Sequence, residues 1–360
     1  MKKVLLWCLH RPDRSPSQRF RIEEFIPYLE KNGYKIYYSF LLDEADDKIF
    51  YKPGNYFGKL KIVTKSILKR IAELKNAEQY DLVFVQREAS MLGTDYFEKN
   101  ISKKIPLIFD FDDSIWQQKV SEKNKNLAFL KNADKTSKII SYATMVFAGN
   151  NYLADYARQY NRQVEIIPTT IDTQVYQYVN SNKKDGVCIG WSGSFSTIQY
   201  FQYAIPALLR IKKKFGDKVN FKIIGDESYY CEELQTQGAP WKAKTEVLDL
   251  SEMDIGIMPL PDDEWTKGKC GLKGLQYMAL GIPTLMSPVG VNTDIIQNGV
   301  NGFLPATEDD WVECITQLVE DKILRQQIGE AGKQTVINCY SSTAWEDKYL
   351  KLFKAVTTKY

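Results

Sequence analysis

The chain alternates short, continuously apolar runs with segments of helical periodicity along most of its length. Runs such as VLLWCL (4–9), DLVFVQ (81–86) and MVFAG (145–149) are too short for core helices and lack the polar alternation of half-exposed strands. Strands that are buried on both faces and joined by helices form parallel sheets covered by helices on each side. The pattern therefore predicts an α/β protein built from doubly wound parallel sheets.

This alternation stops once and starts again, which indicates two domains of the same type. The stretch 169–186, TTIDTQVYQYVNSNKKDG, is polar and linker-like, and the strand-like VCIGWSG then opens a second series. With 360 residues, of which 44% are hydrophobic, the chain is long enough for two cores. We predict a first domain over 1–178, completed by a C-terminal helix within 340–360, and a second domain over 185–339.

Composition and charge exclude several classes of function. The formal net charge of +3 argues against a general nucleic-acid binder. Six cysteines without a CxxC pair and a single histidine leave no zinc constellation, and they favour a reduced, cytoplasmic chain. The apolar run near the N-terminus is too short for a signal peptide, and no segment is long enough for a membrane-spanning helix. Any membrane contact is expected to be peripheral.

The segment 254–305 predicts an anion site. A strand-like IGIMPLP leads into a glycine-rich loop with lysines at 267, 269 and 273, and a helix is expected from Leu272 to Leu280. Glycines let the backbone approach a ligand closely, and the first amide groups and the dipole of the helix favour negative charge there. A phosphate group is the simplest ligand for such a site.

Polar clusters follow the ends of several predicted strands. Ligands of open parallel sheets bind at the carboxyl ends of the strands, so these clusters mark the expected position of function. They are HRPDRSPSQRFR after the first strand, QRE after the third, DFDDSIW after the fourth, SGSFST after the first strand of the second domain, and Asp226 after KIIG.

These segments carry a resemblance to a known group of enzymes. From Cys188 to Pro305, the succession of IGWSGSFS, KIIGD, LQYMALGIPTLMSPVG and NGVNGFLP, followed by GEAGKQTV, resembles the nucleotide-sugar-binding domain of retaining glycosyltransferases with the GT-B fold, in particular family 4. In the first half, SPSQRFRIEEFIPYLEKNG, VFVQREAS and FDFDDSIW resemble a subgroup from bacterial surface-polysaccharide assembly. The resemblance implies two Rossmann-like domains that face each other across a cleft.

The resemblance also implies a reaction. A hexose-type sugar would pass, with retention of configuration, from a nucleotide diphosphate sugar on the second domain to a hydroxyl acceptor on the first. The acceptor would be a lipid-linked or growing bacterial surface glycan. Two alternatives stay open: a nucleotide-sugar epimerase of the same architecture, and a catalytically silent nucleotide-sugar-binding subunit.

At the donor site the chain departs from the family. The two glutamates that family members carry near the sugar and the ribose fall on Gly268 and Gln276, and the usual arginine and lysine pair after the first strand of the second domain is missing. We expect Gln276 to hydrogen-bond a ribose hydroxyl, and Lys269 and Lys273 to clamp the diphosphate; a merely solvated charged face is the alternative for the lysines. The predicted donor-binding residues are Gly193, Ser194, Ser196, Thr197, Asp226, Lys269, Gly271, Leu272, Lys273 and Gln276.

The first domain supplies candidates for the chemistry and for the acceptor. Family members place a histidine after the fourth strand, where this chain has Asp112 and Asp113. Either carboxylate could accept the proton of the acceptor hydroxyl if its surroundings raise its pKa, and Glu88 is a second candidate base. The lone histidine, His10, either faces the cleft or caps the first strand. The predicted acceptor-binding residues are Arg14, Ser17, Arg19 and Arg87. The guanidinium groups of the three arginines suit a pyrophosphate.

The aspartates of DFDD have a second interpretation, because a similar pair holds a divalent cation in the single-domain GT-A glycosyltransferases. They lie far along the chain from the predicted phosphate loop. We therefore expect a metal-independent enzyme with no cofactor besides its nucleotide-sugar substrate.

The segment 59–75 predicts a basic amphipathic helix. Its apolar residues Leu60, Val63, Ile67, Ile71 and Leu74 recur at helical spacing among lysines and arginine. Such a helix either lies on an anionic membrane surface or packs normally with a solvated face. We predict a cytoplasmic protein, either free or peripheral on the inner face of the cytoplasmic membrane.

Overall fold

The computed structural model places the described residues in two compact units. The first unit contains Met1–Pro168 and Glu346–Tyr360, and the second contains Thr169–Trp345. The predicted boundary at 178 thus falls inside the second unit, and the predicted return at 340 precedes the observed one. The residues described are 1–117, 132, 134–180 and 185–358.

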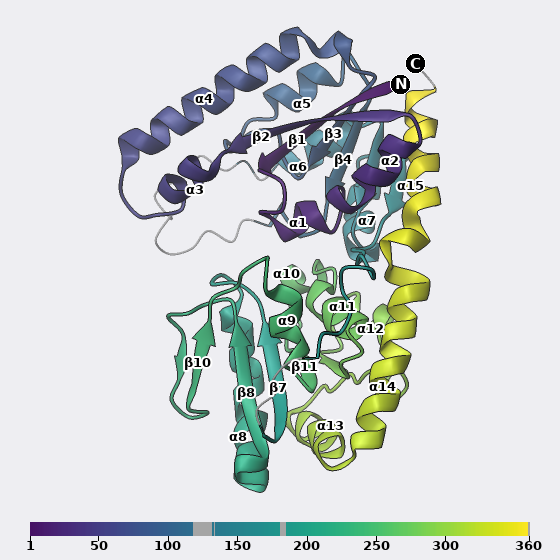
Figure 1. Cartoon of the computed structure of the whole chain (residues 1–360). Helices are drawn as coiled ribbons and strands as arrows, with labels where there is room; N and C mark the ends of the chain where they lie inside the picture. The colour runs from purple at the N-terminus through teal and green to yellow at the C-terminus, as the bar shows by residue number, and fades with distance from the viewer. Residues whose placement is uncertain (118–131, 133, 181–184, 359–360) are drawn as a thin grey trace. The chain divides into compact units, whose positions relative to one another are not determined.

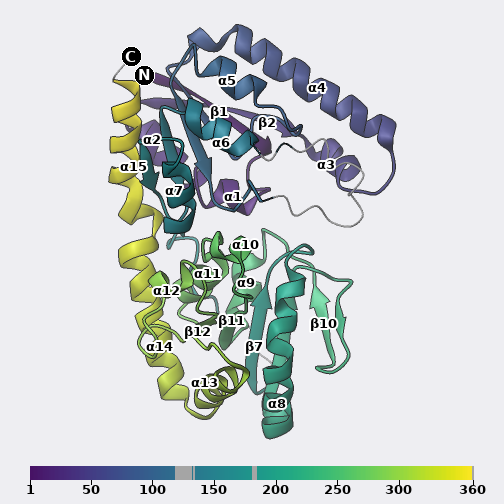
Figure 2. The same ribbon diagram turned by 180° about the vertical axis from the view of Figure 1, so that it is seen from behind.

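A parallel sheet in the order β2-β1-β3-β4-β5-β6 forms the centre of the first unit. Its central strands β3, β4 and β5 are buried along their whole length because helices cover both faces of the sheet (Figures 1 and 2). This explains their continuous apolar sequences. The strands are β1 (Lys2–His10), β2 (Tyr34–Leu42), β3 (Leu82–Gln86), β4 (Leu107–Phe111), β5 (Met145–Ala148) and β6 (Val164–Ile166).

The last helix of the chain completes the core of the first unit. Tyr349 stacks on Phe25 with ring centroids 4.1 Å apart, and Phe353 lies 5.9 Å from Phe84. The end of α15 lies beside the start of β1 (Figure 1), where Lys2 Nζ donates to the Thr357 carbonyl at 3.3 Å. The helices are α1 (Pro16–Arg19), α2 (Ile26–Lys31), α3 (Glu44–Phe50), α4 (Tyr56–Lys75), α5 (Tyr96–Ile101), α6 (Lys135–Tyr142), α7 (Asn151–Arg158) and α15 (Ser342–Thr357), with 3₁₀ turns at Glu23–Phe25 and Ala77–Gln79.

One predicted helix is only partly described. The sequence predicts a helix over 127–140, and the structure has α6 beginning at Lys135. Residues 118–131 and 133, on which the start of that prediction falls, lie outside the described residues.

The second unit repeats the architecture with the strand order β12-β11-β7-β8-β10-β9, in which β9 alone among the described strands pairs antiparallel. Its core joins Trp191 and Ile255 of the sheet to Leu208 of α8 and Trp311 of α13. The predicted α/β class is therefore confirmed for both units. The strands are β7 (Val187–Ser192), β8 (Val219–Ile224), β9 (Tyr230–Cys231), β10 (Thr236–Ala239), β11 (Ile255–Met258) and β12 (Thr284–Met286).

Helices surround this second sheet, and two of them begin at the sequence signals expected of helix starts. Asp263 and Thr307 each form a capping box with the third residue of the following helix, α10 and α13. The helices are α8 (Ile205–Phe215), α9 (Glu246–Ser251), α10 (Glu264–Lys267), α11 (Leu272–Ala279), α12 (Asn292–Ile295), α13 (Glu308–Glu320) and α14 (Lys322–Thr335), with 3₁₀ turns at Ile198–Ala204 and Gly216–Lys218 and a π-helical turn at Val336–Tyr340.

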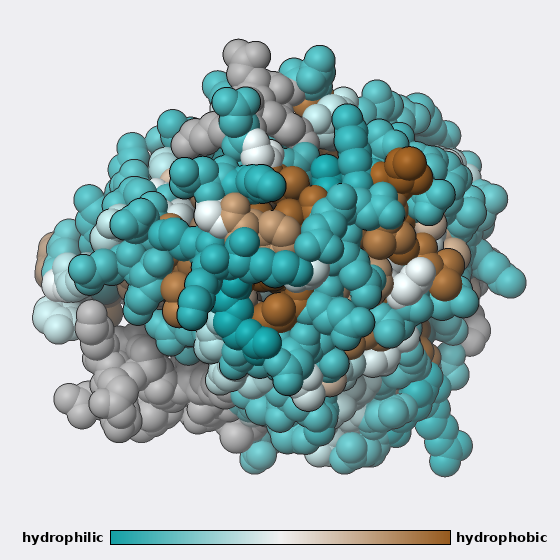
Figure 3. Space-filling model, turned by 90° about the horizontal axis from the view of Figure 1, so that it is seen from below, coloured by the Kyte–Doolittle hydropathy of each residue, from teal (hydrophilic) through white to brown (hydrophobic). Residues whose placement is uncertain are grey.

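In the face shown in Figure 3, hydrophobic residues form separate small groups among hydrophilic ones. Within the described part of the chain, no helix combines the length and the apolarity needed to cross a bilayer.

Candidate functional site

The carboxyl end of β7 is held against α11 of the second unit. The buried hydroxyl of Tyr277 accepts from the Ser192 amide at 2.7 Å and lies 2.9 Å from the Ser192 hydroxyl. Immediately after the strand, Gly193 passes so close to Trp191 that a Cβ atom there would lie 2.2 Å from the indole ring. The glycine is required for this close approach, which brings the following loop toward the start of α11.

The loop after β7 gathers three hydroxyl groups. Ser194 Oγ lies 3.0 Å from Ser196 Oγ and 3.2 Å from Thr197 Oγ1, and Thr197 Oγ1 accepts from the Ser194 amide at 2.9 Å. Lys273 Nζ of α11 donates to Thr197 Oγ1 at 3.4 Å. Four of the predicted donor-binding residues are therefore brought together.

Lys273 occupies an unusual environment for a cation. Its Nζ lies 4.5 Å from the ring centroid of Trp191, a distance typical of a cation–π contact. Among the described residues, no carboxylate forms an ion pair with it. Burial and the neighbouring Lys269 ammonium together lower the pKa of Lys273 to about 7. A second lysine is thus close by, and Lys269 Nζ itself lies 5.1 Å from the ring of Trp265.

The first turn of α11 adds backbone donors to these lysines. Gly271 precedes the helix with φ = 70°, a left-handed conformation that glycine adopts without strain, and no side chain caps the helix there. The first amide groups of a helix without a side-chain cap lack internal partners and carry partial positive charge. The amides after Gly271, together with Lys269, Lys273 and the loop hydroxyls, form a cationic cluster that we call the lysine site.

Gln276 belongs to a buried hydrogen-bond network of the second unit. It is buried, and its Nε2 donates to Glu246 Oε1 at 3.0 Å and to the Tyr176 hydroxyl at 2.9 Å. Glu246 also accepts from Tyr176 and from Trp241 Nε1, at 2.6 and 2.8 Å. The second unit therefore does hold a carboxylate beside Gln276, contributed by α9 rather than by α11.

Asp226 is engaged locally. Its Oδ1 accepts from the amide and the hydroxyl of Ser228, at 2.9 and 2.6 Å. This is a turn stabilised by an aspartate side chain. Its predicted contact with the donor stays a prediction.

In the first unit, the predicted base candidates after β4 are ion-paired. Arg87 Nε donates to Asp112 Oδ1 at 2.8 Å, and Arg87 Nη2 lies 3.8 Å from Asp113 Oδ2. Burial acts to raise the pKa of Asp112, but Arg87, with a hydrogen bond from Ser17, outweighs it and holds the pKa below its usual value. The condition set for a base, a raised pKa, is therefore not met at Asp112.

The remaining candidates of the first unit also have defined partners. Glu88 Oε2 accepts from Lys135 Nζ at 2.7 Å, and Arg19 lies over the ring of Phe20 at 4.9 Å. Arg87 adopts φ = 64°, which non-glycine residues rarely do, and its amide donates to the Asp110 carbonyl at 2.7 Å. Such local strain persists only where surrounding contacts hold it.

Asp110 of the DFDD sequence has a structural role. Both its oxygens accept from Arg21 Nε at 3.2 Å, and both side chains are fully buried. Arg21 also donates to the Ile167 carbonyl. Within the described residues, no group of three or more potential ligands could hold a metal ion.

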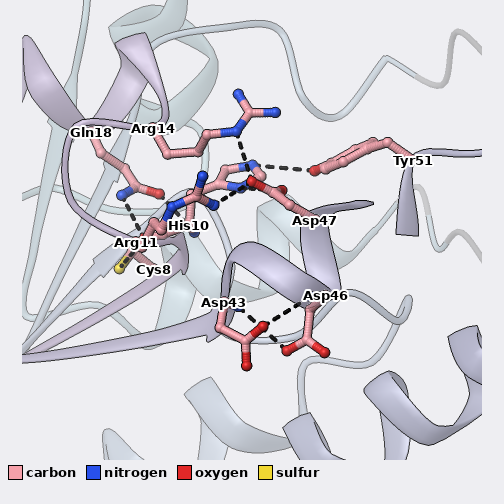
Figure 4. A network of polar contacts seen from close by, with 9 residues as sticks. All are labelled: Cys8, His10, Arg11, Arg14, Gln18, Asp43, Asp46, Asp47 and Tyr51. Carbon is pink, nitrogen blue, oxygen red and sulfur yellow. Dashed lines mark hydrogen bonds and ion pairs between the residues drawn. The ribbon is translucent and has the colours of Figure 1, made fainter. Parts of the chain in front are cut away.

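His10 belongs to a polar cluster at the end of β1, of which sequence reasoning missed Asp47 and Tyr51 (Figure 4). Its Nε2 lies 3.2 Å from the Tyr51 hydroxyl, and its Nδ1 lies 3.8 Å from Asp47 Oδ1. Asp47 also accepts from Arg14 Nε at 2.8 Å and from Arg11. The polar sequence DEADD after β2 follows the same strand-end rule as the other clusters, so the rule could have identified Asp47.

Comparisons with known proteins agree with this architecture. Residues 186–321 match the family described as "Glycosyl transferases group 1". A search of curated protein sequences found no match.

Solved structures match over nearly the whole chain. HepE of Anabaena, solved in complex with UDP and glucose, is 15% identical and superposes with a TM-score of 0.69 over 99% of this chain and 100% of its own. A glycosyltransferase from Rickettsia africae gives 14% identity and a TM-score of 0.68, over 100% of this chain and 99% of its own. Sucrose-phosphate synthase from Thermosynechococcus elongatus gives 12% identity and 0.70, over 100% of both chains.

The resemblance drawn from the sequence is thus confirmed at the level of fold and of the family match. The segment 186–321 that matches contains the lysine site. The chain has the fold of the GT-B glycosyltransferases, and residues 186–321 of its second unit match the glycosyl transferases group 1 family.

Proposed function

We propose that the protein is a glycosyltransferase that moves a hexose-type sugar from a nucleotide diphosphate sugar to a hydroxyl acceptor. The observation that carries this proposal is the lysine site: Lys273 without an ion-pair partner among the described residues, Lys269 beside it, and hydroxyls and helix amides around them. Such a cluster fits a diphosphate, whose oxygens accept from ammonium, hydroxyl and amide donors. The match to the group 1 family supports the same donor.

The chemistry that this site can perform is charge stabilisation. When the bond between sugar and diphosphate breaks, negative charge grows on the departing phosphate oxygens. Lysines and oriented amides stabilise that charge without reorganising, which lowers the barrier. We propose that Lys269, Lys273 and the first turn of α11 do this, with retention of configuration and without a metal ion.

Gln276 gives the donor site its proposed ribose contact. Because its Nε2 already bonds Glu246 and Tyr176, the amide oxygen is the atom left to accept from a ribose hydroxyl. Gly268 supplies no side chain for the sugar. We propose that the sugar is contacted by other groups of the same site, Asp226 among them.

We propose that the first unit holds the acceptor, a lipid-linked or growing bacterial surface glycan, and that the protein works in the cytoplasm. Contact with an anionic inner membrane surface would run through α4. There Leu60, one of the apolar positions named from the sequence, is exposed, and Ile62, Ser66 and Arg70 form the packed face. No acidic residue occurs between 48 and 73, so the surface of α4 near Leu60 is both apolar and basic.

A nucleotide-binding panel tests the donor proposal. Purified protein is heated with UDP, GDP, CDP, ADP or dTDP, with and without magnesium; UDP comes first because HepE was solved with UDP-glucose. A ligand at about one hundred times its dissociation constant stabilises the native state by about 2.7 kcal/mol. We expect one nucleotide to raise the unfolding midpoint without magnesium in the wild type, and to do so much less in Lys273→Met.

Turnover assays then separate the alternatives. Sugar transfer to an acceptor supports the glycosyltransferase, isomerised donor without acceptor would select the epimerase, and nucleotide binding without either would select the silent subunit. If no nucleotide raises the unfolding midpoint, the proposed donor site is refuted.

A further inference from the structure

The polar cluster at the end of β1 contains more donors than its own contacts use. Asp47 of α3 stands at its centre and is 9% exposed. Its Oδ2 accepts from both Arg11 and Arg14, while its Oδ1 is buried without a hydrogen-bond partner. We call this cluster of His10, Arg11, Arg14, Asp47 and Tyr51 the β1–α3 corner (Figure 4).

The two arginines keep most of their donors free. Arg14 uses only Nε and Arg11 only Nη1 for Asp47, and within the described residues their other guanidinium nitrogens have no partner. Figure 4 shows the two Nη atoms of Arg14 pointing away from Asp47. The side chains are 41% and 31% exposed. Two guanidinium groups that share one carboxylate leave one uncompensated positive charge, with free donors that solvent reaches.

The start of α3 has capping contacts of its own, separate from these arginines. Figure 4 also draws Asp43 and Asp46, which close a capping box at the start of the helix. Lys65 of α4 donates to both carboxylates, at 2.7 and 2.8 Å. Both carboxylates of that group are thus paired with a cation. The β1–α3 corner, by contrast, has free donors and an orphaned carboxylate oxygen.

His10 and Tyr51 form the second side of the corner. Burial is the main cause that lowers the pKa of His10 to about 4, although Asp47 opposes it, and Arg14, Arg11 and Arg87 lower it further. The imidazole is therefore neutral near pH 7, and its Nε2 faces the Tyr51 hydroxyl. Tyr51 is exposed. A neutral hydrogen-bonding pair thus stands beside the free guanidinium donors.

We propose that the β1–α3 corner is the subsite for an acceptor that carries a phosphate or diphosphate group. Arg11 and Arg14, held in place by Asp47, bind the phosphate oxygens, and Tyr51, supported by His10, hydrogen-bonds the acceptor beside them. Guanidinium groups that a carboxylate already orders lose little further freedom on binding, which favours this role. The inference rests on the proposed function and names the acceptor class for it.

Of the three arginines predicted to bind the acceptor, Arg14 is the one that belongs to the β1–α3 corner. Arg87 is paired with Asp112, and Arg19 lies over Phe20. Arg11, Asp47, His10 and Tyr51 are new assignments.

The single histidine of the chain gives a direct test. The imidazole carbon of His10 is labelled with ¹³C, and its NMR signal is followed while inorganic pyrophosphate is added to the full chain. The Lys273→Met background weakens competing binding at the lysine site. We expect a saturable shift of the signal and a rise of the His10 pKa, because a bound anion favours the imidazolium.

Matched variants decide whether the binding is specific. Arg14→Met should weaken pyrophosphate binding by about tenfold or more, the effect of losing one charge-assisted contact. Arg210→Met is the control, because Arg210 is exposed and pairs with Glu308 and Asp309 in the second unit. If Arg14→Met fails to fold, Arg11→Met removes the other guanidinium and gives the same test. No shift of His10, or an equal loss in the Arg14 and Arg210 variants, would overturn the proposal.

Two further arms complete the experiment. A short isoprenyl diphosphate is compared with inorganic pyrophosphate: tighter binding of the isoprenyl compound supports a lipid-linked acceptor, and equal binding supports recognition of the phosphate alone.

Nucleotide thermal shifts are measured on the Arg14→Met chain without the Lys273 change. If the protein binds a nucleotide but the His10 signal does not respond to pyrophosphate, the subsite alone is refuted. If the wild type binds no nucleotide, the proposed function is refuted.

Discussion

The two sheets present cations at their carboxyl ends in different ways. In the first unit, Arg14, Arg21 and Arg87 are each bonded to an aspartate. In the second, Lys273 lies over the indole ring of Trp191 and donates a hydrogen bond to the Thr197 hydroxyl. It has no carboxylate partner among the described residues. The first arrangement is organised before any ligand arrives. The second carries an electrostatic cost that an anion would remove, which is why we assign the diphosphate to it.

The residue types suit these two roles. A guanidinium stays charged and can bind a carboxylate with one edge while it offers donors on another. An ammonium responds to burial by losing its proton, so its charge depends on what is bound nearby. The comparison predicts that changes in the first unit alter stability and that changes in the second alter nucleotide affinity.

Breaking the buried pair of the first unit should have the largest effect. Burial raises the pKa of Asp110 even though Arg21 opposes it, because desolvation disfavours the charged carboxylate. Asp110→Ala would leave the buried Arg21 uncompensated, and we expect a loss of about 3–5 kcal/mol in the free energy of unfolding. Urea denaturation measures this. Asp155→Ala, which breaks the exposed pair with Arg158, is the control and should cost less than about 1 kcal/mol; equal losses in both variants would contradict the account.

Removing the ammonium of Lys273 in the second unit should lower nucleotide affinity without lowering stability. Lys273→Met should weaken the binding of the nucleoside diphosphate by about 1.5–3 kcal/mol, or about 10- to 150-fold, because one charge-assisted contact is lost. The free energy of unfolding should stay the same or rise, since a partly buried ammonium is unfavourable without an anion. Calorimetric titration and urea denaturation of the same variant measure the two quantities. A destabilised chain with unchanged affinity would reverse our assignment.

The pH dependence of affinity sharpens the comparison further. With a pKa of about 7, Lys273 is increasingly neutral above pH 7 in the free protein, whereas a bound diphosphate favours the ammonium. Affinity should therefore fall as pH rises from 7, by at most about tenfold per pH unit. Titrations at several pH values measure this slope. Lys273→Arg, which stays charged, should flatten it; a wild-type affinity that does not vary above pH 7 would contradict the expected shift.

The smallest effect is expected at Lys267. This lysine lies in the same glycine-rich stretch, but it bonds Glu264 at 2.8 Å and lies 3.8 Å from Asp262. Its charge is already compensated at the surface, where ion pairs contribute little. Lys267→Met should change nucleotide affinity by less than about twofold, well below the smallest loss expected from a charge-assisted contact. A loss as large as that of Lys273→Met would mean that the whole loop, rather than the lysine site, binds the nucleotide.

Much of the fold could be predicted from the sequence because its signals are local. The continuous apolar strands specify parallel sheets, and the glycine-rich stretch specifies the start of α11 at Leu272. The packed face of α4 was not predictable in the same way. Its phase depends on Arg70, a residue that hydropathy places outside but that donates to three backbone carbonyls inside the unit, those of Cys8, Ser39 and Ala89.

The candidate sites were predictable as residues but not as environments. Lys273 and Thr197 could be named from their positions near strand and helix ends, and the structure brings them together. That Lys273 also lies over Trp191 depends on the close approach at Gly193, which periodicity does not encode. Asp112 shows the converse: its position was named, but its partner Arg87 comes from another strand end and reverses the expected pKa shift.

Proton uptake on nucleotide binding tests the central claim most directly. The nucleoside diphosphate with the largest thermal shift is titrated into the protein at pH 8, in two buffers with different enthalpies of ionisation. If the diphosphate binds at Lys273, the wild type should take up about one proton, since the free lysine is mostly neutral at that pH and the bound one is charged. Lys273→Met should take up none. Binding without proton uptake in the wild type, or with equal uptake in both chains, would contradict the assignment of the lysine site to the diphosphate.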